Sequence, residues 1–500
     1  MNLGTLLRPL MFLLGLIALT MLIPLLLGLA YGEGVMVKTF LVCMGTTLII
    51  ALPVIFVTRK QKITLSAGDG LVLVFVAWVF TCLVGAVPYY ISGYILRFSD
   101  AVFESVSGFT TTGASVIIDV EALPRSLLFW RAMTHWLGGM GIVVLTVALF
   151  PLLGIEGFLL VKAETSGPES NKILPKITST AKILWLIYTL LTVLQSLLLC
   201  LGGMNWFDAV IHAFSTVATG GFSSRNGGLA TYPSPWIHWV CIIFMILAGF
   251  NFTLFYRLLQ GKYRDMLSNT EAKVYGGIIL VSTGLIILSM FSSDNSLGGS
   301  SFEQSLRYAL FQGVSIVTST GLSITDHSRW PPLAQGVLFC LMFIGACSGS
   351  TSGGIKVIRH VVLFKQMVNE LRRLIYPQGV FLITFNHKAG PHEVAHGVAG
   401  FVFCYMVLVL LTTLWVSSSG MDLFPALNMS LMILGNIGLS IGDESGATSL
   451  YGLPAYIKWF LSFMMITGRL ELWTVLGCFS RDYRHDWTGR RGSRFYKPSG

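Results

Sequence analysis

Four segments of this 500-residue chain end in small, hydroxyl-bearing or amide residues that are followed by a glycine. Glycine tolerates positive φ, so consecutive backbone carbonyls beside it can turn toward one line. Carbonyl oxygens arranged in this way replace the hydration shell of a cation. Because Mg²⁺ and Ca²⁺ usually recruit Asp or Glu, oxygen ligands without carboxylates favour a monovalent cation. These residues therefore predict coordination of a dehydrated alkali ion.

The four segments indicate an internal repeat. Their glycines lie 107, 101 and 117 residues apart when the segments are aligned on Gly113, Gly220, Gly321 and Gly438. The candidate ion-binding residues are Thr111, Thr112, Gly113, Ala218, Thr219, Gly220, Ser319, Thr320, Gly321, Asn436, Ile437 and Gly438. The fourth segment departs from the others, because Asn436 and Ile437 stand where the other three have small or hydroxyl residues. We expect a chemically uneven ring of ligands.

The segments are too short to cross a bilayer and too apolar for loops. Non-helical backbone cannot face lipid, so a glycine-containing stretch at membrane depth must be buried in protein or line a watery cavity. A short helix that enters from outside ends with unpaired carbonyls and about half a negative charge pointing inward, which attracts cations. We interpret the segments as re-entrant pore helices that converge on one axis.

The composition is that of a polytopic membrane protein. Apolar residues make up 54% of the chain and charged residues 11%, against about 25% charged in soluble proteins. The net charge of +10 lies on scattered flanking clusters, which argues against a nucleic-acid-binding surface. Apolar runs long enough to cross about 30 Å of hydrocarbon occur at residues 5–31, 34–58, 68–92, 125–153, 180–203, 234–260, 271–291, 331–375, 393–418 and 452–480.

The distribution of positive charge gives the topology. Placing Arg8 in the cytoplasm puts 24 of the 33 Lys and Arg residues inside, eight outside and Arg469 within a span. This satisfies the positive-inside rule with both termini cytoplasmic. The predicted fold is an all-α polytopic membrane protein, with an N-terminal two-helix hairpin and four repeats of span, pore helix and span in pseudo-fourfold arrangement. The predicted units are a hairpin (1–62), pore repeats at 63–160, 161–265, 266–376 and 377–485, and a basic cytoplasmic tail (486–500).

Two elements are candidates for a gate. The eighth span is interrupted by GACSGSTSGG at 345–354, which would not hold a helix at mid-membrane and must face the cavity beneath the filter; a packing kink is the alternative. Arg469 lies mid-span, where a charge costs at least about 2.5 to 3.5 kcal/mol, so we expect it to face the pore; a purely structural arginine is the alternative. The candidate gating residues are Gly345, Cys347, Gly349, Gly353, Gly354, Lys356 and Arg469.

Other motifs carry no catalytic signal. GSTSGGIK superficially resembles a phosphate-binding loop, but GK[ST] is absent and no predicted strand precedes it, so we expect no nucleotide on this chain. His135 lies beside three glycines, which favours helix packing over a proton relay. Neither a Ser/His/Asp arrangement nor paired carboxylates present themselves, so an enzyme is not predicted; a polytopic membrane enzyme is the alternative.

Several motifs together point to a known family. They are TTTGAS at 110–115, FSTVATGGFS at 214–223, TSTGLS at 318–323, GNIGLS at 435–440, WRAMTHWLGGMGIVVL at 130–145, GACSGSTSGGIKV at 345–357 and GRLELWTVL at 468–476. With them the chain resembles the Trk-type potassium uptake membrane subunits of the Trk/Ktr/HKT superfamily over residues 1–485. Gly113 fills the place where sodium-conducting plant-type relatives have serine, so the resemblance implies K⁺ as the transported ion. The hairpin within 5–58, usually missing in Ktr-type members, favours the Trk type.

The resemblance also implies partners. These are a second copy of the chain, in a homodimer with one pore per protomer in the bacterial inner membrane, and a cytosolic ring of TrkA-like nucleotide-binding regulatory subunits. The basic tail, together with Arg372 and Arg373, is a candidate contact for that ring or for membrane lipid headgroups. A sodium-selective or Na⁺-coupled transporter of the same fold and the membrane subunit of a K⁺-pumping ATPase are the alternative functions. Channel-like conduction and ion-coupled symport both stay open.

Overall fold

The chain folds almost entirely into helices. The computed structural model describes residues 3–59, 67–141, 177–292, 301–379, 381–382, 384–385, 388–389, 393–439 and 450–478. Among them, two antiparallel strands of two residues each, β1 (Thr384–Phe385) and β2 (Lys388–Ala389), are the exceptions to the all-helical fold. The second half of the predicted span at 125–153 and the basic tail at 486–500 lie outside the described residues.

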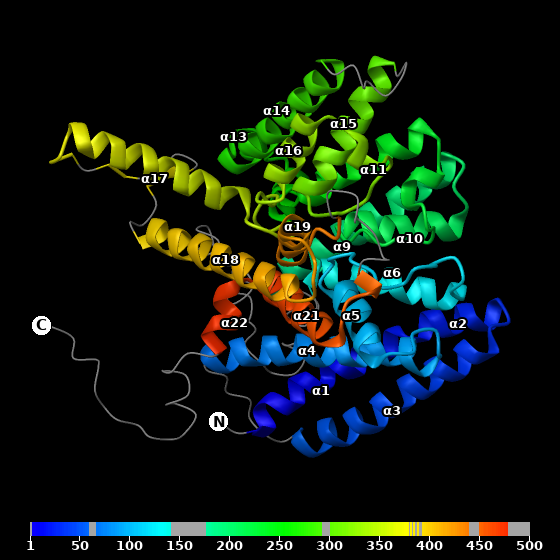
Figure 1. Cartoon of the computed structure of the whole chain (residues 1–500). Coiled ribbons are helices and arrows are strands. Elements are labelled where there is room, and N and C mark those ends of the chain that lie inside the picture. Colours follow the sequence, from blue (N-terminus) through cyan, green and yellow to red (C-terminus); the bar gives the residue numbers. More distant parts are fainter. Residues whose placement is uncertain are drawn as a thin grey trace, which may run out of the picture.

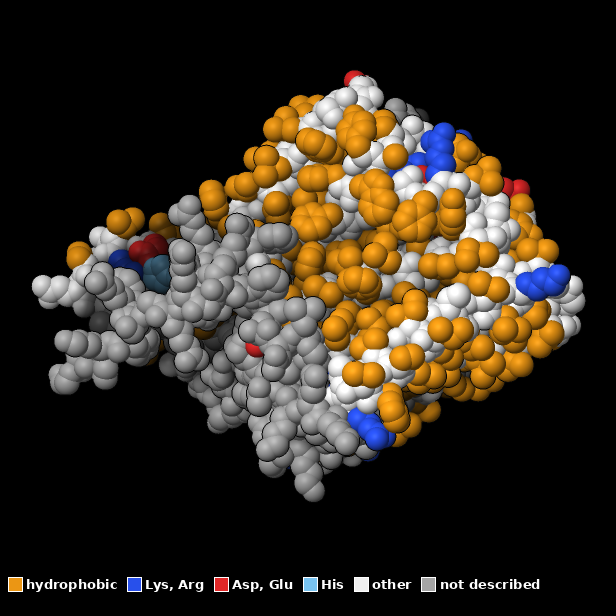
Figure 2. Space-filling view, turned by 90° about the horizontal axis from the view of Figure 1, so that it is seen from below, with side chains coloured by type: hydrophobic (Ala, Val, Ile, Leu, Met, Phe, Trp, Pro, Cys, Tyr) orange, Lys and Arg blue, Asp and Glu red, His pale blue; other side chains and the backbone are white. Residues whose placement is uncertain are grey.

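The N-terminal hairpin consists of α1 (Leu3–Thr20), α2 (Leu22–Ala30) and α3 (Gly34–Thr58), so the first predicted span is two helices that meet at Met21. Helix α1 packs against α3 and α4, and the hairpin lies along one side of the molecule (Figure 1). Figure 2 shows the molecule from this side, where hydrophobic side chains cover most of the described surface. Apolar surface on this scale suits a lipid-facing wall.

Four repeats follow the hairpin, and each contains a long helix, a short helix and a second helix. The first is α4 (Ala67–Ile91), α5 (Phe98–Phe109) and α6 (Arg125–Gly139); the second is α9 (Ile177–Leu201), α10 (Trp206–Val217) and α11 (Pro235–Gly249). The third is α14 (Thr270–Ser292), α15 (Phe302–Val317) and α16 (Pro332–Leu341); the fourth is α18 (Glu393–Ser417), α19 (Leu423–Leu434) and α21 (Ala455–Arg469). Short 3₁₀ helices, η3 (Gly228–Thr231) and η4 (His327–Arg329), follow the short helices of the second and third repeats.

The short helices are held inside the protein. All residues of α5 from 100 to 109 are buried, and α5 packs against α4, α6 and α21. Because α21 belongs to the fourth repeat, the last repeat packs against the first. Local capping supports two of the short helices: Asn205 accepts from Asp208 N–H at 2.9 Å at the start of α10, and Ser301 accepts from Gln304 N–H at 3.3 Å at the start of α15. Burial explains why these helices are apolar although they are too short to span.

The second helix of each repeat stops early. After α11 the chain bends by 93° into α12 (Phe252–Leu259) and then α13 (Tyr263–Ser268). After α16 an irregular segment leads to α17 (Val357–Ile375), and after α21 the chain continues in α22 (Leu472–Cys478). The runs at 234–260, 331–375 and 452–480 are therefore not continuous helices. Glu471 marks the last break with a φ of +59°. By length and apolarity, six helices of the described part can cross a membrane, or seven if the bent pair is one span.

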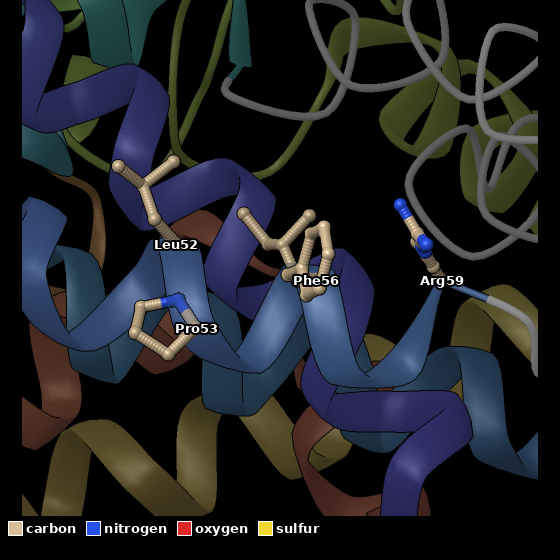
Figure 3. Close-up of a pocket in the computed structure, with 5 residues that line it drawn as sticks. Leu52, Pro53, Phe56 and Arg59 are labelled. Carbon is tan, nitrogen blue, oxygen red and sulfur yellow. The ribbon is translucent and has the colours of Figure 1, made fainter.

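A shallow groove of about 500 Å³ lies on the hairpin near the end of α3 (Figure 3). Its walls are apolar, from Leu52, Pro53, Ile55 and Phe56, and Arg59 stands at one end. The Arg59 guanidinium carbon lies 4.1 Å from the centre of the Phe56 ring. Helix α17 packs against α18, and the two helices extend outward from the body (Figure 1).

Candidate ion-binding site

Each short helix ends in the same hydrogen-bonded cap, the Schellman motif. In the first repeat, Thr111 N–H donates to Gly108 O at 3.0 Å and Thr112 N–H donates to Ser107 O at 2.9 Å. The equivalent bonds in the other three repeats measure 2.7–3.2 Å. In this cap, two carbonyl groups at each helix end accept hydrogen bonds from the backbone. Fewer carbonyls are therefore unpaired there than the sequence analysis predicted. The partial negative charge of the helix dipole still lies at this end.

A residue with a side chain takes the left-handed conformation in every cap. The φ values are +54° at Thr111, +55° at Thr219, +51° at Ser319 and +52° at Asn436. For a residue with a Cβ, this conformation costs about 1 to 2 kcal/mol. Strain of this kind concentrates at functional sites, where the surrounding structure enforces it. Four equivalent strained residues therefore mark the ends of the short helices as the candidate site.

Two places further along, every repeat has a glycine with positive φ. The values are +80° at Gly113, +87° at Gly221, +73° at Gly321 and +75° at Gly438. The equivalent glycine of the second repeat is therefore Gly221, and the alignment on Gly220 is wrong by one residue. Gly220 corresponds to Thr112 of the first repeat, and Ala218 is the C-cap residue of α10. The sequence does carry a signal for this choice, because a serine stands two places after the glycine in every repeat and selects Gly221.

These four glycines, called the ring glycines below, join the repeats into a closed circle. A Cβ built on a ring glycine would come closer than 3.0 Å to a backbone oxygen of the next repeat: Gly113 to Gly220 O, Gly221 to Thr320 O, Gly321 to Ile437 O and Gly438 to Thr112 O. Real Cβ atoms do not approach this closely. Backbone therefore meets backbone at all four junctions, including the one between the last repeat and the first.

Side-chain oxygens add to the backbone oxygens at this place. Thr111 Oγ1 and Asn436 Oδ1 are buried and have no hydrogen-bond partner among the described residues. The Asn436 amide is oriented by its NH₂ group, which donates to Thr112 Oγ1 at 2.8 Å and to Met465 O at 3.0 Å. Buried oxygens without a donor are unusual in folded proteins. A Cβ built on Gly353 or Gly468 would lie 3.1 or 2.8 Å from Asn436 Oδ1, so this oxygen faces the irregular segment and α21.

The irregular segment at 345–354 lies directly against the ends of the short helices. Gly353 N–H donates to Ser319 Oγ at 2.6 Å, and the Thr351 hydroxyl lies 3.2 Å from Val217 O. A Cβ on Gly353 would come closer than 3.0 Å to Gly435 O, and a Cβ on Gly345 would do the same to Gly353 O. Glycine is required here because the segment packs backbone against backbone.

Further contacts anchor this segment to the second repeat and to α14. Cys347 N–H donates to Gly249 O, and Phe252 N–H donates to Gly349 O, both at 3.0 Å. The Glu271 carboxylate accepts from the backbone N–H and the hydroxyl of Ser348, both at 2.7 Å, and from Ile358 N–H at 3.2 Å. Glu271 was not among the sequence-predicted residues, since a single acid at the start of an apolar run resembles any helix-flanking charge.

Arg469 is the last residue of α21. Its guanidinium donates to Thr351 O at 2.6 Å, to Gly138 O at 2.7 Å and to Gly139 O at 3.0 Å. Gly138 and Gly139 close α6, so the positive charge lies at the negative end of that helix dipole. Arg469 thereby links the fourth repeat to the first repeat and to the irregular segment of the third.

Other charged groups surround the same region. Lys356, the N-cap residue of α17, donates from Nζ to Ser352 O of the irregular segment at 2.6 Å. Glu471 pairs with Arg359 at 2.5 Å, which joins the start of α17 to the break after α21. In the sequence, Arg359 is one of the positively charged residues that the charge distribution places in the cytoplasm. Its pairing depends on the break at Glu471, which no periodicity indicates.

His135 supports the backbone of the second repeat. Gly108 O accepts at 2.7 Å from its Nδ1–H, so Nε2 is the acceptor that receives Phe222 N–H at 3.2 Å. The imidazole ring stacks on Phe222 with centroids 4.0 Å apart. A Cβ on Gly220 would come closer than 3.0 Å to this ring. The geometry thus matches the packing role that the neighbouring glycines favoured.

The fold and the site define a multi-pass membrane protein with four short buried helices, and backbone contacts join the segments after them in a ring. A model of the TrkH family, described as cation transport protein, matches residues 38–485. The chain belongs to this family. It is 39% identical to the Trk system potassium uptake protein TrkH of Halomonas elongata over 96% of this chain and 99% of that protein. It is 37% identical to TrkH of Escherichia coli K12, over 92% and 95%. The crystal structure of the potassium transporter TrkH from Vibrio parahaemolyticus matches with a TM-score of 0.86 and 32% identity, covering 97% of this chain and 100% of that chain.

Proposed function

We propose that this chain takes up potassium across the bacterial inner membrane through a pore inside a single protomer. The ring glycines and the residues before them form the selectivity filter, where backbone oxygens replace the hydration shell of K⁺. The observation that carries this proposal is the closed circle of backbone contacts between the four repeats. The relatives named as potassium uptake proteins, which match over most of their length, support the choice of ion.

The irregular segment and Arg469 form the gate in this proposal. The segment is bonded to Ser319 beside the filter, and Arg469 holds it through Thr351 O. A fixed positive charge below a cation filter opposes permeation. Movement of Arg469 together with the segment therefore opens the path.

The driving force needs no nucleotide on this chain. A membrane potential supplies about 2.3 kcal/mol per charge for each 100 mV. A tenfold concentration gradient opposes this with about 1.4 kcal/mol. A potential of about 100 mV therefore supports about 40- to 50-fold accumulation of K⁺.

The partners are a second copy of the chain, a TrkA-like regulatory ring on the cytoplasmic face and membrane lipid. The groove on α3 suits a lipid acyl chain, because its walls are apolar and Arg59 stands at one end for a phosphate. The relatives are named as proteins of a Trk system, which supports the expectation that the chain works with further protein components.

Flux measurement tests the proposed function. Purified protein is reconstituted into liposomes loaded with K⁺, and uptake of ⁸⁶Rb⁺ and ²²Na⁺ is compared against empty liposomes. We expect ⁸⁶Rb⁺ to enter faster than ²²Na⁺. Uptake of ²²Na⁺ with exclusion of ⁸⁶Rb⁺ would show that the transported ion is sodium and not potassium. If neither ion enters, while growth of a potassium-uptake-deficient strain is still rescued at low K⁺, conduction by the chain alone is wrong.

A further inference from the structure

A second set of repeat-equivalent contacts lies on the far side of the ring glycines from the caps. Two residues after each ring glycine the sequence has a serine: Ser115, Ser223, Ser323 and Ser440. Nine residues before each ring glycine, on the short helix, stand Glu104, His212, Gln312 and Met429. In the first three repeats, the structure brings these two positions together.

In the first repeat the contact is made by a carboxylate. The Ser115 hydroxyl donates to Glu104, with oxygen separations of 3.0 and 3.1 Å, and Val116 N–H donates to Glu104 Oε2 at 3.0 Å. Arg131 Nε donates to Glu104 Oε1 at 2.6 Å, while its NH1 donates to Ser223 O at 3.0 Å. Glu104 is fully buried and Arg131 nearly so. The pair therefore holds the serine of its own repeat and, through Arg131, the serine of the next.

In the second repeat the contact is made by an imidazole. Asp208 O accepts from His212 Nδ1–H at 2.7 Å, so Nε2 is the acceptor for the Ser223 hydroxyl at 3.0 Å. In the third repeat the contact is made by an amide: Ser323 Oγ lies 3.3 Å from Gln312 Oε1, and the same hydroxyl donates to Thr325 O at 2.7 Å. Both helix residues are fully buried.

The fourth repeat differs in chemistry. Met429 is buried, but a thioether donates no hydrogen bond and accepts only weakly. Ser440, the serine of this repeat, lies outside the described residues. Three different polar groups thus serve one geometric purpose in three repeats, and an apolar side chain occupies the equivalent place in the last.

We infer that Glu104, His212 and Gln312 are positioning residues of the filter, each of which fixes the serine beyond its ring glycine and so sets the spacing of the backbone oxygens. The inference rests on the proposed function and extends it, because it assigns ion selectivity to side chains that do not touch the ion. A filter wall that is held at both ends resists contraction around a smaller ion. Loss of one such contact therefore admits Na⁺ more readily.

Gln312 offers the sharpest test, because its Nε2 is buried without a hydrogen-bond partner among the described residues. Gln312→Met copies the residue of the fourth repeat and removes that unpaired group, so thermal unfolding in detergent should not weaken. In the liposome assay we expect the ratio of ⁸⁶Rb⁺ to ²²Na⁺ uptake to fall about fivefold, equal to about 1 kcal/mol at 1.4 kcal/mol per tenfold. Gly276→Ala, on an open face of α14, is the matched control and should keep the ratio.

Ser323→Ala and the double variant, which combines it with Gln312→Met, complete a double-mutant cycle. If the contact itself sets selectivity, the double variant should lose no more than the larger single loss. Additive losses, or an unchanged ratio in Gln312→Met with uptake retained, would overturn the inference while leaving the proposed function intact. Exclusion of ⁸⁶Rb⁺ by an unmodified protein that admits ²²Na⁺ would overturn both. Should Gln312→Met fail to fold, the ratio in Ser323→Ala alone decides, and a ratio equal to that of the unmodified protein contradicts the inference.

Discussion

Gly353 N–H donates a hydrogen bond to Ser319 Oγ at 2.6 Å. One residue belongs to the irregular segment proposed as the gate, and the other has the strained left-handed conformation beside the proposed filter. The proposed gate and the proposed filter are therefore in direct contact. Any movement of the segment away from the pore must first break this bond.

Removing the acceptor should make the segment easier to displace. Ser319→Ala leaves Gly353 N–H buried without its partner, which costs about 1 to 3 kcal/mol in the closed state. A shift of that size corresponds to about 5- to 150-fold in the closed-to-open equilibrium. We expect raised ⁸⁶Rb⁺ uptake in the absence of any regulatory subunit. Ser418→Ala, at a remote and exposed site, is the control and should behave like the unmodified protein. If Ser319→Ala takes up ⁸⁶Rb⁺ no faster than the unmodified protein, the hydrogen bond to Gly353 does not hold the segment closed.

The ring glycines should not tolerate even one methyl group. Gly221→Ala places a Cβ where Thr320 O lies and forces alanine into positive φ, the latter alone costing about 1 to 2 kcal/mol. We expect uptake to be lost in vesicles and growth at low K⁺ to fail. Gly277→Ala, which has open space around it, is the control. Normal uptake by Gly221→Ala would contradict both the corrected alignment and the ring.

Arg469→Ala should release the gate. The substitution removes a guanidinium that donates to three backbone oxygens, and charged hydrogen bonds of this kind contribute about 1.5 to 3 kcal/mol each. We expect at least about tenfold higher basal uptake, equal to about 1.4 kcal/mol. Arg469→Lys keeps the charge without the planar fork and should lie between. Unchanged conduction and unchanged regulation in Arg469→Ala would leave the arginine with a folding role only.

Acid should weaken the connection between the loops that follow α5 and α10. Asn226 donates to Asp119 Oδ1 at 2.8 Å, and this hydrogen bond holds the pKa of Asp119 below its ordinary value of 3.8. A lowered pKa in the folded state means that the contribution is present above the unfolded value and is lost as pH falls through the folded one. The difference in unfolding temperature between the unmodified protein and Asp119→Ala should therefore shrink as pH falls below about 3.8. A difference that stays constant from pH 6 to pH 3 would show that the carboxylate charge is irrelevant.

The repeat and the segments that meet in the ring were accessible from the sequence, because hydroxyl residues followed by glycine at regular intervals have few explanations in an apolar chain. The charge pattern and segment lengths likewise predicted a helical membrane protein with short buried helices. The position of the second ring glycine was accessible too, but the alignment on Gly220 missed it. Only Gly221 has a serine two places further along, as the other ring glycines do, and its contact with Thr320 O and its φ of +87° agree with that spacing.

Long-range polar contacts were also missed. Glu104 and Arg131 lie 27 residues apart, and Glu271 meets Ser348 across 77 residues. Each is a single charged residue near an apolar run, which resembles an ordinary flanking charge until the fold brings its partner close. The breaks after α11 and α21 were hidden for a similar reason, since apolar composition continues across them while the backbone changes direction. The break after α16 was predicted from the glycines and serines of 345–354.

The junction between Gly438 and Thr112 has a consequence for how the protein is made. These two residues are 326 positions apart, and their contact is the one that turns an open row of segments into a circle. A nascent chain that has emerged through its third repeat has three quarters of the wall and an unmatched surface at each edge. The proposed filter can therefore close only after the fourth repeat has been made.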